Sequence, residues 1–157
     1  MKELLQISIK PICSAVSPPE YAYPGDAGFD LKSTIKRALA PSERFIFSCG
    51  FAIEIPEGFA GLVLPRSGLA SKFGITVINS PGLVDSGYRG EIKVICDNLS
   101  KDSPIIIKKG DKIAQLMIIQ HETADFVVVD KLSDSERGIG GFGSTGYANV
   151  ESVPENS

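Results

Sequence analysis

Residues 75–98, ITVINSPGLVDSGYRGEIKVICDN, decide the fold class of this chain. Short runs rich in β-branched residues alternate here with turns that contain proline and glycine, a pattern that favours strands over helices. The runs are Ile75 to Asn79, Leu83 to Asp85 and Ile92 to Asn98. Within this stretch, the segment from Asn79 to Ile92 predicts a β-hairpin.

The same pattern extends over the whole chain, whose 157 residues include ten prolines and sixteen glycines. The further predicted strands are Leu5 to Ile9, Gly28 to Ser33, Arg44 to Cys49, Phe51 to Ile55, Ala60 to Leu64, Ile105 to Ile107, Lys112 to Gln120 and Phe126 to Val129. One helical fragment, Ser67 to Lys72, follows Pro65 and is long enough for one or two turns. The sequence therefore predicts an all-β barrel or sandwich with one very short helix.

Composition and net charge limit the classes of protein to which this chain can belong. An apolar content of 43% over this length fits one globular domain. The net charge is −3 and no run of Lys and Arg forms a basic patch, which argues against nucleic acid or a membrane surface as a partner. Without a secretory signal or a long apolar run, we expect a soluble cytoplasmic protein.

Cysteine and histidine usage gives no sign of a metal or disulfide framework. Cys13, Cys49 and Cys96 are widely separated and contain no CxxC pair, so we expect buried small hydrophobic residues. The one histidine, His121, follows a predicted strand and is expected to be a surface residue.

A glycine-rich segment, RGIGGFGSTG at residues 137–146, has five glycines in ten residues and cannot build a core. Its backbone N–H groups, the Ser144 and Thr145 hydroxyls and the Arg137 guanidinium suit phosphate oxygens, and Phe142 suits a flat ring. A flexible tail is the alternative interpretation of this composition.

Two segments place polar groups beside predicted strand ends. Asp30 follows a glycine at the start of a strand, where its carboxylate can reach a hydrated divalent cation, although a turn with ordinary aspartates would look similar. Arg66 and Ser67 open the helical fragment, a placement suited to an anion. An N-cap Ser67 beside a solvated Arg66 is the alternative.

Two other segments carry candidate chemistry. Asp85 can serve as a general base and Tyr88 can pack against a sugar, with the Asn79 amide nearby; the alternative is an ordinary turn aspartate with a cross-strand tyrosine. Gln115 lies on the polar phase of its strand, where its amide could donate to a phosphate oxygen. A solvated strand residue is the simpler interpretation of Gln115.

Taken in order, the segments AGFDL, PRSGLA, GLVDSGYRG, GDKIAQL and RGIGGFGSTG resemble the five motifs of the trimeric dUTPase family, the dUTP pyrophosphatases. The resemblance covers the chain from Pro24 to Gly146. It implies a jelly-roll-like distorted β-barrel at residues 1–136, an active-site arm at 137–146 and a disordered tail at 147–157. It also implies a homotrimer with sites at subunit boundaries, where a neighbour lends the arm.

The resemblance further implies hydrolysis of dUTP to dUMP and pyrophosphate, which keeps uracil out of DNA and supplies dUMP for dTMP synthesis. Asp85 would deprotonate the water that attacks the α-phosphorus, and Tyr88 would lie beneath the deoxyribose and exclude a 2′-hydroxyl. Asp30 would act through water on Mg²⁺. The other implied contacts are Asn79, Leu83 and Val84 to uracil, Arg66, Ser67, Gly68 and Gln115 to the triphosphate, Phe142 stacked on uracil, and Arg137, Gly143, Ser144 and Thr145 to the β- and γ-phosphates.

Two details depart from the family pattern. Asp26 stands where many members carry a small hydroxyl residue, and eleven residues follow the arm motif. Two other functions stay open. A dCTP deaminase shares the fold, but Gly68 replaces a serine of its second motif and Glu91 is the only nearby carboxylate. A nucleotide-sensing module would have no need of Asp85.

Overall fold

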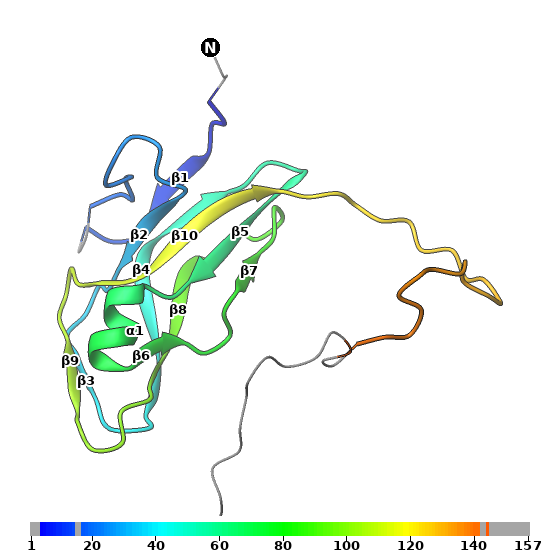
Figure 1. Cartoon of the computed structure of the whole chain (residues 1–157). Coiled ribbons are helices and arrows are strands. Elements are labelled where there is room, and N and C mark those ends of the chain that lie inside the picture. The colour runs from blue at the N-terminus through cyan, green and yellow to red at the C-terminus, as the bar shows by residue number, and fades with distance from the viewer. Residues whose placement is uncertain (1–3, 15–16, 142–143, 145–157) are drawn as a thin grey trace, which may run out of the picture. The chain divides into compact units, whose positions relative to one another are not determined.

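The computed structural model describes residues 4–14, 17–141 and 144 (Figure 1). The chain divides into two units, Met1–Thr123 and Ala124–Ser157, each of which is described by itself. The first unit holds all the strands and the one helix of the described residues. The predicted boundaries at residues 136 and 146 stay predictions.

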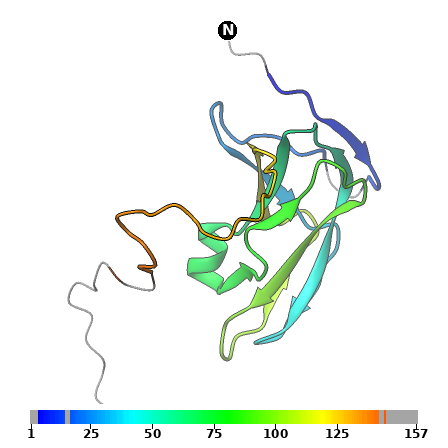
Figure 2. The ribbon, with the colours of Figure 1, turned by 90° about the vertical axis from the view of Figure 1, so that its right-hand side faces the viewer.

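Two four-stranded antiparallel sheets and a two-stranded ribbon form the first unit (Figures 1 and 2). The first sheet has the order β1 (Ser8–Pro11), β4 (Arg44–Glu54), β8 (Glu91–Asn98), β6 (Ile75–Val77). The second has the order β2 (Gly28–Lys32), β10 (Lys112–Gln120), β5 (Phe59–Leu64), β7 (Gly82–Val84). The ribbon pairs β3 (Arg37–Leu39) with β9 (Ile105–Ile107), and helix α1 spans Ser67–Phe73.

The core lies where alternating strand residues turn their apolar side chains inward. Ile92, Val94 and Cys96 of β8 are buried, and so are Leu31 of β2 and Leu116 of β10. All of them belong to one continuous apolar cluster. The predicted all-β class with one short helix is confirmed, although the strands do not close into a single barrel within the described residues.

Strand β4 runs through a stretch in which two separate strands were predicted. Gly50 has a φ of 80°, and the pairing of β4 with β8 shifts between Ser48 and Ala52. The Glu91 carboxylate accepts hydrogen bonds from the Gly50 N–H at 2.9 Å and the Ser48 hydroxyl at 3.2 Å. These two bonds occupy Glu91 and hold the bulge, so the strand bends without ending.

The segment predicted as a hairpin has a different pairing. β7 pairs with β5 in the second sheet, whereas β6 and β8 pair with each other in the first. The strands on either side of the Asp85 to Tyr88 turn therefore lie in different sheets, and the simple hairpin prediction is wrong. The turn itself is confirmed, because the Tyr88 N–H donates to the Asp85 carbonyl at 3.1 Å.

The predicted strands differ from the observed ones at two further places. Strand β3 was not predicted, and Phe126 to Val129 form no strand although three β-branched residues follow the phenylalanine. Val128 is 98% exposed. No described strand offers its backbone to this segment, and an extended chain without a partner has no ladder of hydrogen bonds.

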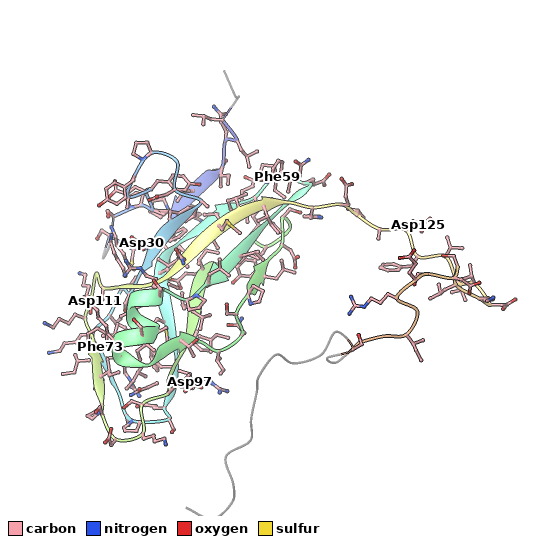
Figure 3. All side chains as sticks on the ribbon, viewed as in Figure 1. Asp30, Phe59, Phe73, Asp97, Asp111 and Asp125 are labelled. Carbon is pink, nitrogen blue, oxygen red and sulfur yellow. The ribbon has the colours of Figure 1, made fainter. Side chains whose placement is uncertain are left out.

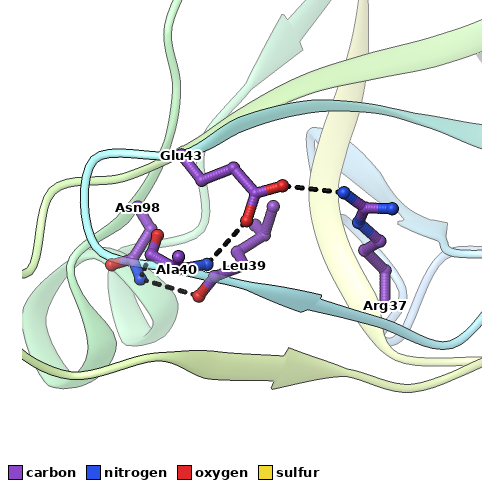
Figure 4. A network of polar contacts seen from close by, with 5 residues as sticks. All are labelled: Arg37, Leu39, Ala40, Glu43 and Asn98. Atoms are coloured by element: carbon purple, nitrogen blue, oxygen red, sulfur yellow. Dashed lines mark hydrogen bonds and ion pairs between the residues drawn. The ribbon is translucent and has the colours of Figure 1, made fainter.

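A buried polar side chain joins the ribbon to the first sheet (Figure 4). The Asn98 amide donates to the carbonyls of Leu39, Ala40 and Ser103 at 3.1–3.2 Å, and its oxygen accepts from the Ser100 N–H at 3.0 Å. Beside it, the pKa of Glu43 is lowered mainly by a hydrogen bond from the Arg37 side chain and to a lesser extent by one from the Ala40 N–H.

The cysteines separate into two kinds. Cys49 and Cys96 are fully buried, as predicted, and burial is the main cause that raises the pKa of each to about 12. Cys13 is exposed, so the expectation of burial is wrong for this residue. His121 is exposed at the end of β10, as predicted. No helix in the described part of the chain combines the length and apolar character needed to cross a membrane.

Candidate functional site

A cleft of about 670 Å³ lies where β2, β10 and the junction of β5 with α1 meet. Five of the predicted site residues line it together: Asp30, Arg66, Ser67, Gly68 and Gln115. The other lining residues are Ala22, Tyr23, Asp26, Ala27, Gly28, Leu69, Lys72 and Phe73. Figure 3 labels Asp30 on β2 and Phe73 at the end of α1.

Asp30 is the most constrained charge of the cleft. It lies between the inward-facing Phe29 and Leu31, so the alternation of β2 turns it to the opposite face. Its two oxygens form ion pairs with the Arg66 Nε at 2.9 Å and the Lys112 Nζ at 2.7 Å. Because the Asp30 side chain is only 15% exposed, these pairs are screened less than surface pairs.

Lys112 reaches Asp30 because of an irregularity in β10. The pairing of β10 with β2 shifts between Lys112 and Ala114, which leaves one extra residue, Ile113, on β10. Lys112 therefore lies opposite Lys32 and shares the face of Asp30, whereas strict alternation would place it with Ala114 and Leu116 in the core. No role for Lys112 was predicted from the sequence.

The start of α1 agrees with the sequence prediction in part. Ser67 is the first helical residue, and Arg66 is the N-cap, with no side chain capping the helix. The alternative of an N-cap serine is therefore excluded. A Cβ at Gly68 would meet nothing within 4 Å, so the glycine leaves open space in the wall of the cleft. The Arg66 Nη1 also donates to the Lys112 carbonyl at 3.1 Å.

Gln115 ties β10 to the segment between β5 and α1. Its Nε2 donates to the Pro65 carbonyl at 3.0 Å. A primary amide has two donor hydrogens, so a second hydrogen stays available to a ligand. Gln115 is half-buried and bonded, so it is more constrained than the solvated strand residue of the simpler interpretation.

A second group of predicted residues lies around β7: Asn79, Leu83, Val84, Asp85 and Tyr88. Gly82 brings the backbone close to the Asn79 amide, since a Cβ there would lie 3.0 Å from its Nδ2. The Tyr88 hydroxyl donates to the Glu91 carbonyl at 3.0 Å. This bond lays the ring across Gly90, where a Cβ would lie 2.9 Å from the Tyr88 Cε2 and closer to other ring atoms.

The two groups are well separated within one chain. β5 and β7 are antiparallel, and Gly61 lies opposite Val84. Asp85 therefore lies near Ala60. Ala60 is six residues before Arg66, which follows the end of β5, so the separation is roughly 20 Å at most if the chain stays extended. None of the residues around β7 lines the cleft beside Arg66.

The predicted arm is described only in part. The Arg137 Nε donates to the Gly140 carbonyl at 2.8 Å, and the Ser144 N–H donates to the Gly141 carbonyl at 3.0 Å. Phe142, Gly143 and Thr145 lie outside the described residues, as does the predicted tail.

The few carboxylates of the cleft suit a metal ion whose ligands are mostly water and substrate phosphate oxygens. Asp26 and Asp30 are the only carboxylates that line it, and the described residues contain no cluster of three or more candidate ligands. Mg²⁺ is usually bound through one or two carboxylates together with water and substrate phosphates.

The fold and the cleft define an all-β protein with a partly enclosed site whose arginine, serine, glycine and amide groups suit a phosphorylated ligand. The comparisons give the family. A family model described as dUTPase matches residues 15–146. The deoxyuridine 5'-triphosphate nucleotidohydrolase of Thermobifida fusca is 56% identical over 128 residues, 82% of this chain and 72% of that protein. The protein of the same name from Corynebacterium glutamicum is 47% identical over 146 residues, 93% and 98% of the two chains. This chain belongs to the dUTPase family and is an enzyme of that family.

Solved structures agree with this assignment. The dUTPase of Staphylococcus bacteriophage 80alpha, solved with dUpNHpp, has a TM-score of 0.84 and 30% identity, covering 90% of this chain and 99% of that chain. A mutant dUTPase from phage phi11 of S. aureus, described with a structural Mg(II) ion, has a TM-score of 0.77 and 25% identity, covering 83% and 100%. The fold prediction of a jelly-roll-like dUTPase is thereby confirmed.

Proposed function

We propose that this chain hydrolyses dUTP to dUMP and pyrophosphate by in-line attack of water on the α-phosphorus. The observation that carries the proposal is the gathering of Arg66, Ser67, Gly68, Gln115 and Asp30 in one cleft. The names of the relatives and the dUTP analogue bound by the phage 80alpha enzyme support the substrate.

The proposed reaction needs a base and a binding site for the leaving group. Asp85 takes a proton from the water as the new bond forms between the water oxygen and the α-phosphorus, and the bond from that phosphorus to the β-phosphate oxygen breaks. Arg66, Ser67 and Gln115 bind the phosphate chain, whose charge moves onto the departing pyrophosphate. The Gly68 backbone admits the phosphates without a side chain in the way.

Recognition of the nucleoside is assigned to the residues around β7. Tyr88 packs under the deoxyribose and leaves no room for a 2′-hydroxyl, while Asn79 and the backbone at Leu83 and Val84 bond the uracil edge. A site that pairs each polar group of its substrate rejects bases that leave one unpaired. The arm completes the site, with Phe142 on the base and Arg137, Gly143, Ser144 and Thr145 at the β- and γ-phosphates.

Asp30 is proposed to face Mg²⁺ through water. When bound to phosphate oxygens, the cation supplies neutralisation of the triphosphate charge. Both Asp30 oxygens also pair with cations of this chain, and a carboxylate has enough lone pairs for a water ligand in addition.

We propose a homotrimer with composite sites because the cleft residues and the residues around β7 lie far apart within one chain. Phosphates bound at Arg66 would lie roughly 20 Å from Asp85 of the same chain. Asp85 from one chain and Arg66 from another can meet at a subunit boundary. The biological roles, which are to keep uracil out of DNA and to supply dUMP, follow from the reaction, and the cytoplasmic location stays a prediction.

The deaminase alternative loses its candidate carboxylate. Glu91 is occupied by the Gly50 N–H and the Ser48 hydroxyl at the β4 bulge. A carboxylate bonded in this way serves the bend of the strand.

The test is pyrophosphate release from dUTP, dCTP, dTTP and UTP with Mg²⁺, for the wild type and Asp85→Asn. We expect release from dUTP to be far faster than from the other three nucleotides, and a loss of about 10²–10⁴-fold in Asp85→Asn, the usual contribution of a general base. Asp102→Asn, an exposed carboxylate of the loop between β8 and β9, is the matched control and should keep full activity. Ammonia from dCTP would support a deaminase, and binding of dUTP without turnover would support a sensor.

A further inference from the structure

We infer that Lys112 is a positioning residue of the phosphate site, acting through Asp30 on Arg66. This inference rests on the proposed function of the cleft.

Three contacts tie the residues into a closed ring. Asp30 binds the Arg66 Nε with one oxygen and the Lys112 Nζ with the other. Arg66 returns to the backbone of Lys112 through its Nη1. The ring links β2, β10 and the N-cap of α1, so it fixes the guanidinium relative to both strands.

The ring also divides the donors of Arg66. A guanidinium has five N–H donors. The Nε lies in an ion pair with Asp30 and one Nη1 hydrogen bonds the Lys112 carbonyl, so the rest of the guanidinium fork stays available to a ligand in the cleft. Orientation matters here, because Arg binds phosphate through a planar fork with fixed directions.

The charge balance depends on Lys112. Arg66 and Asp30 by themselves form a neutral pair. With Lys112 the three side chains carry a net charge of +1, which favours a polyanion at a partly buried position. Without the lysine, Asp30 would be free to shift toward Arg66 and hold more of its donors.

The bulge of β10 is the local structure that places Lys112 for this role. Without the extra residue Ile113, Lys112 would lie opposite Ser33 and turn toward the core. Ser33 is fully buried, so a lysine there would lose its hydration. Bulges that re-aim a side chain are common beside active sites.

The experiment compares Lys112→Met, Lys112→Arg and the control Lys109→Met. Methionine keeps the apolar stem and removes the charge, and Lys109 is an exposed lysine of the turn that precedes β10, with no ion pair in the described chain. Calorimetry measures binding of inorganic pyrophosphate and of deoxyuridine separately, and steady-state kinetics gives kcat and KM for dUTP.

We expect Lys112→Met to weaken pyrophosphate binding and to raise the KM for dUTP about tenfold. The kcat should stay within about twofold of wild type, because a group that binds the ground state and the transition state equally changes KM and not kcat. Deoxyuridine binding and the melting temperature should stay at wild-type values, and Lys112→Arg should recover most of the loss. In an Asp30→Asn background, Lys112→Met should add no further loss, because the coupling runs through that carboxylate.

Two results would overturn the inference. Lys112→Met could match Lys109→Met in every constant, or it could weaken deoxyuridine and pyrophosphate equally, as a general structural defect would. A wild-type enzyme that neither binds pyrophosphate nor hydrolyses dUTP would instead refute the proposed function, and the two failures are therefore distinguishable.

Discussion

Gly90→Ala tests whether the position of the Tyr88 ring matters for the substrate. In the native chain the ring lies over Gly90, and its hydroxyl donates to the Glu91 carbonyl. A Cβ at residue 90 would lie 2.5 Å from the Tyr88 Cζ, whereas ordinary contact begins at 3.4 Å. The ring must therefore move by about 1 Å or more.

The effect should fall on catalysis more than on stability. Tyr88 is 45% exposed, so the ring can swing outward at the loss of one hydrogen bond, about 1 kcal/mol. A misplacement of about 1 Å in a substrate-positioning group can reduce the rate by about 10²-fold. We expect kcat/KM for dUTP to fall about 10–100-fold, with a smaller fall for UTP, so that discrimination between the two sugars weakens.

The assay is kcat/KM for dUTP and UTP, with the melting temperature measured on the same samples. Gly87→Ala is the matched control in the same turn, because a Cβ there meets nothing within 4 Å. If Gly90→Ala retained the activity and sugar selectivity of Gly87→Ala, the reasoning about the ring would be refuted.

Two predictions concern stability. Asn98→Ala removes four hydrogen bonds from a buried site and should lower the free energy of unfolding by about 3 kcal/mol, as measured by urea denaturation. A loss under about 1 kcal/mol would contradict the role of Asn98 in joining the ribbon to the first sheet. The folded state holds Cys49 and Cys96 protonated until about pH 12, while the unfolded chain ionises near pH 9, so each thiol should remove about 1.4 kcal/mol of stability per pH unit above 9. If the free energy of unfolding fell as steeply with pH in Cys49→Ala as in the wild type between pH 9 and 11, this prediction would be contradicted. The same burial predicts that iodoacetamide labels Cys13 first in the native protein, and mass spectrometry of the labelled peptides checks it.

Strands with clear local signals could be predicted from the sequence. Ile105 to Ile107 and Lys112 to Gln120 have the predicted bounds, because each run is apolar and limited by turn residues. The failure at Phe126 to Val129 has a physical origin. High strand propensity describes how a residue fits a sheet surface, and it does not supply the neighbouring strand.

The cleft could be predicted residue by residue, but its internal contacts could not. Asp30, Arg66 and Gln115 were each identified from their own segments, and the fold brings them together. The ion pair of Lys112 depends on a bulge that reverses the alternation of β10 at a single residue. A periodic pattern in the sequence carries no sign of where one residue is added to a ladder.

The pairing of β7 was missed for a related reason. The β-branched runs on either side of the Asp85 turn suggest a local hairpin, because consecutive strands usually pair. In the fold, Gly82 and Val84 pair with β5 and so belong to the other sheet. Long-range pairing of this kind is decided by packing across the core, which local patterns do not encode.

The central claim is that one site takes Asp85 and Arg66 from different chains. Its most direct test is dUTP hydrolysis by a mixed oligomer, made by co-expressing Asp85→Asn with Arg66→Ala and purified through two different tags. Each variant alone should be nearly inactive, while each mixed trimer keeps one intact site of its three, so the doubly purified sample should show about one third of wild-type activity. A mixed oligomer as inactive as its parents would contradict the composite site.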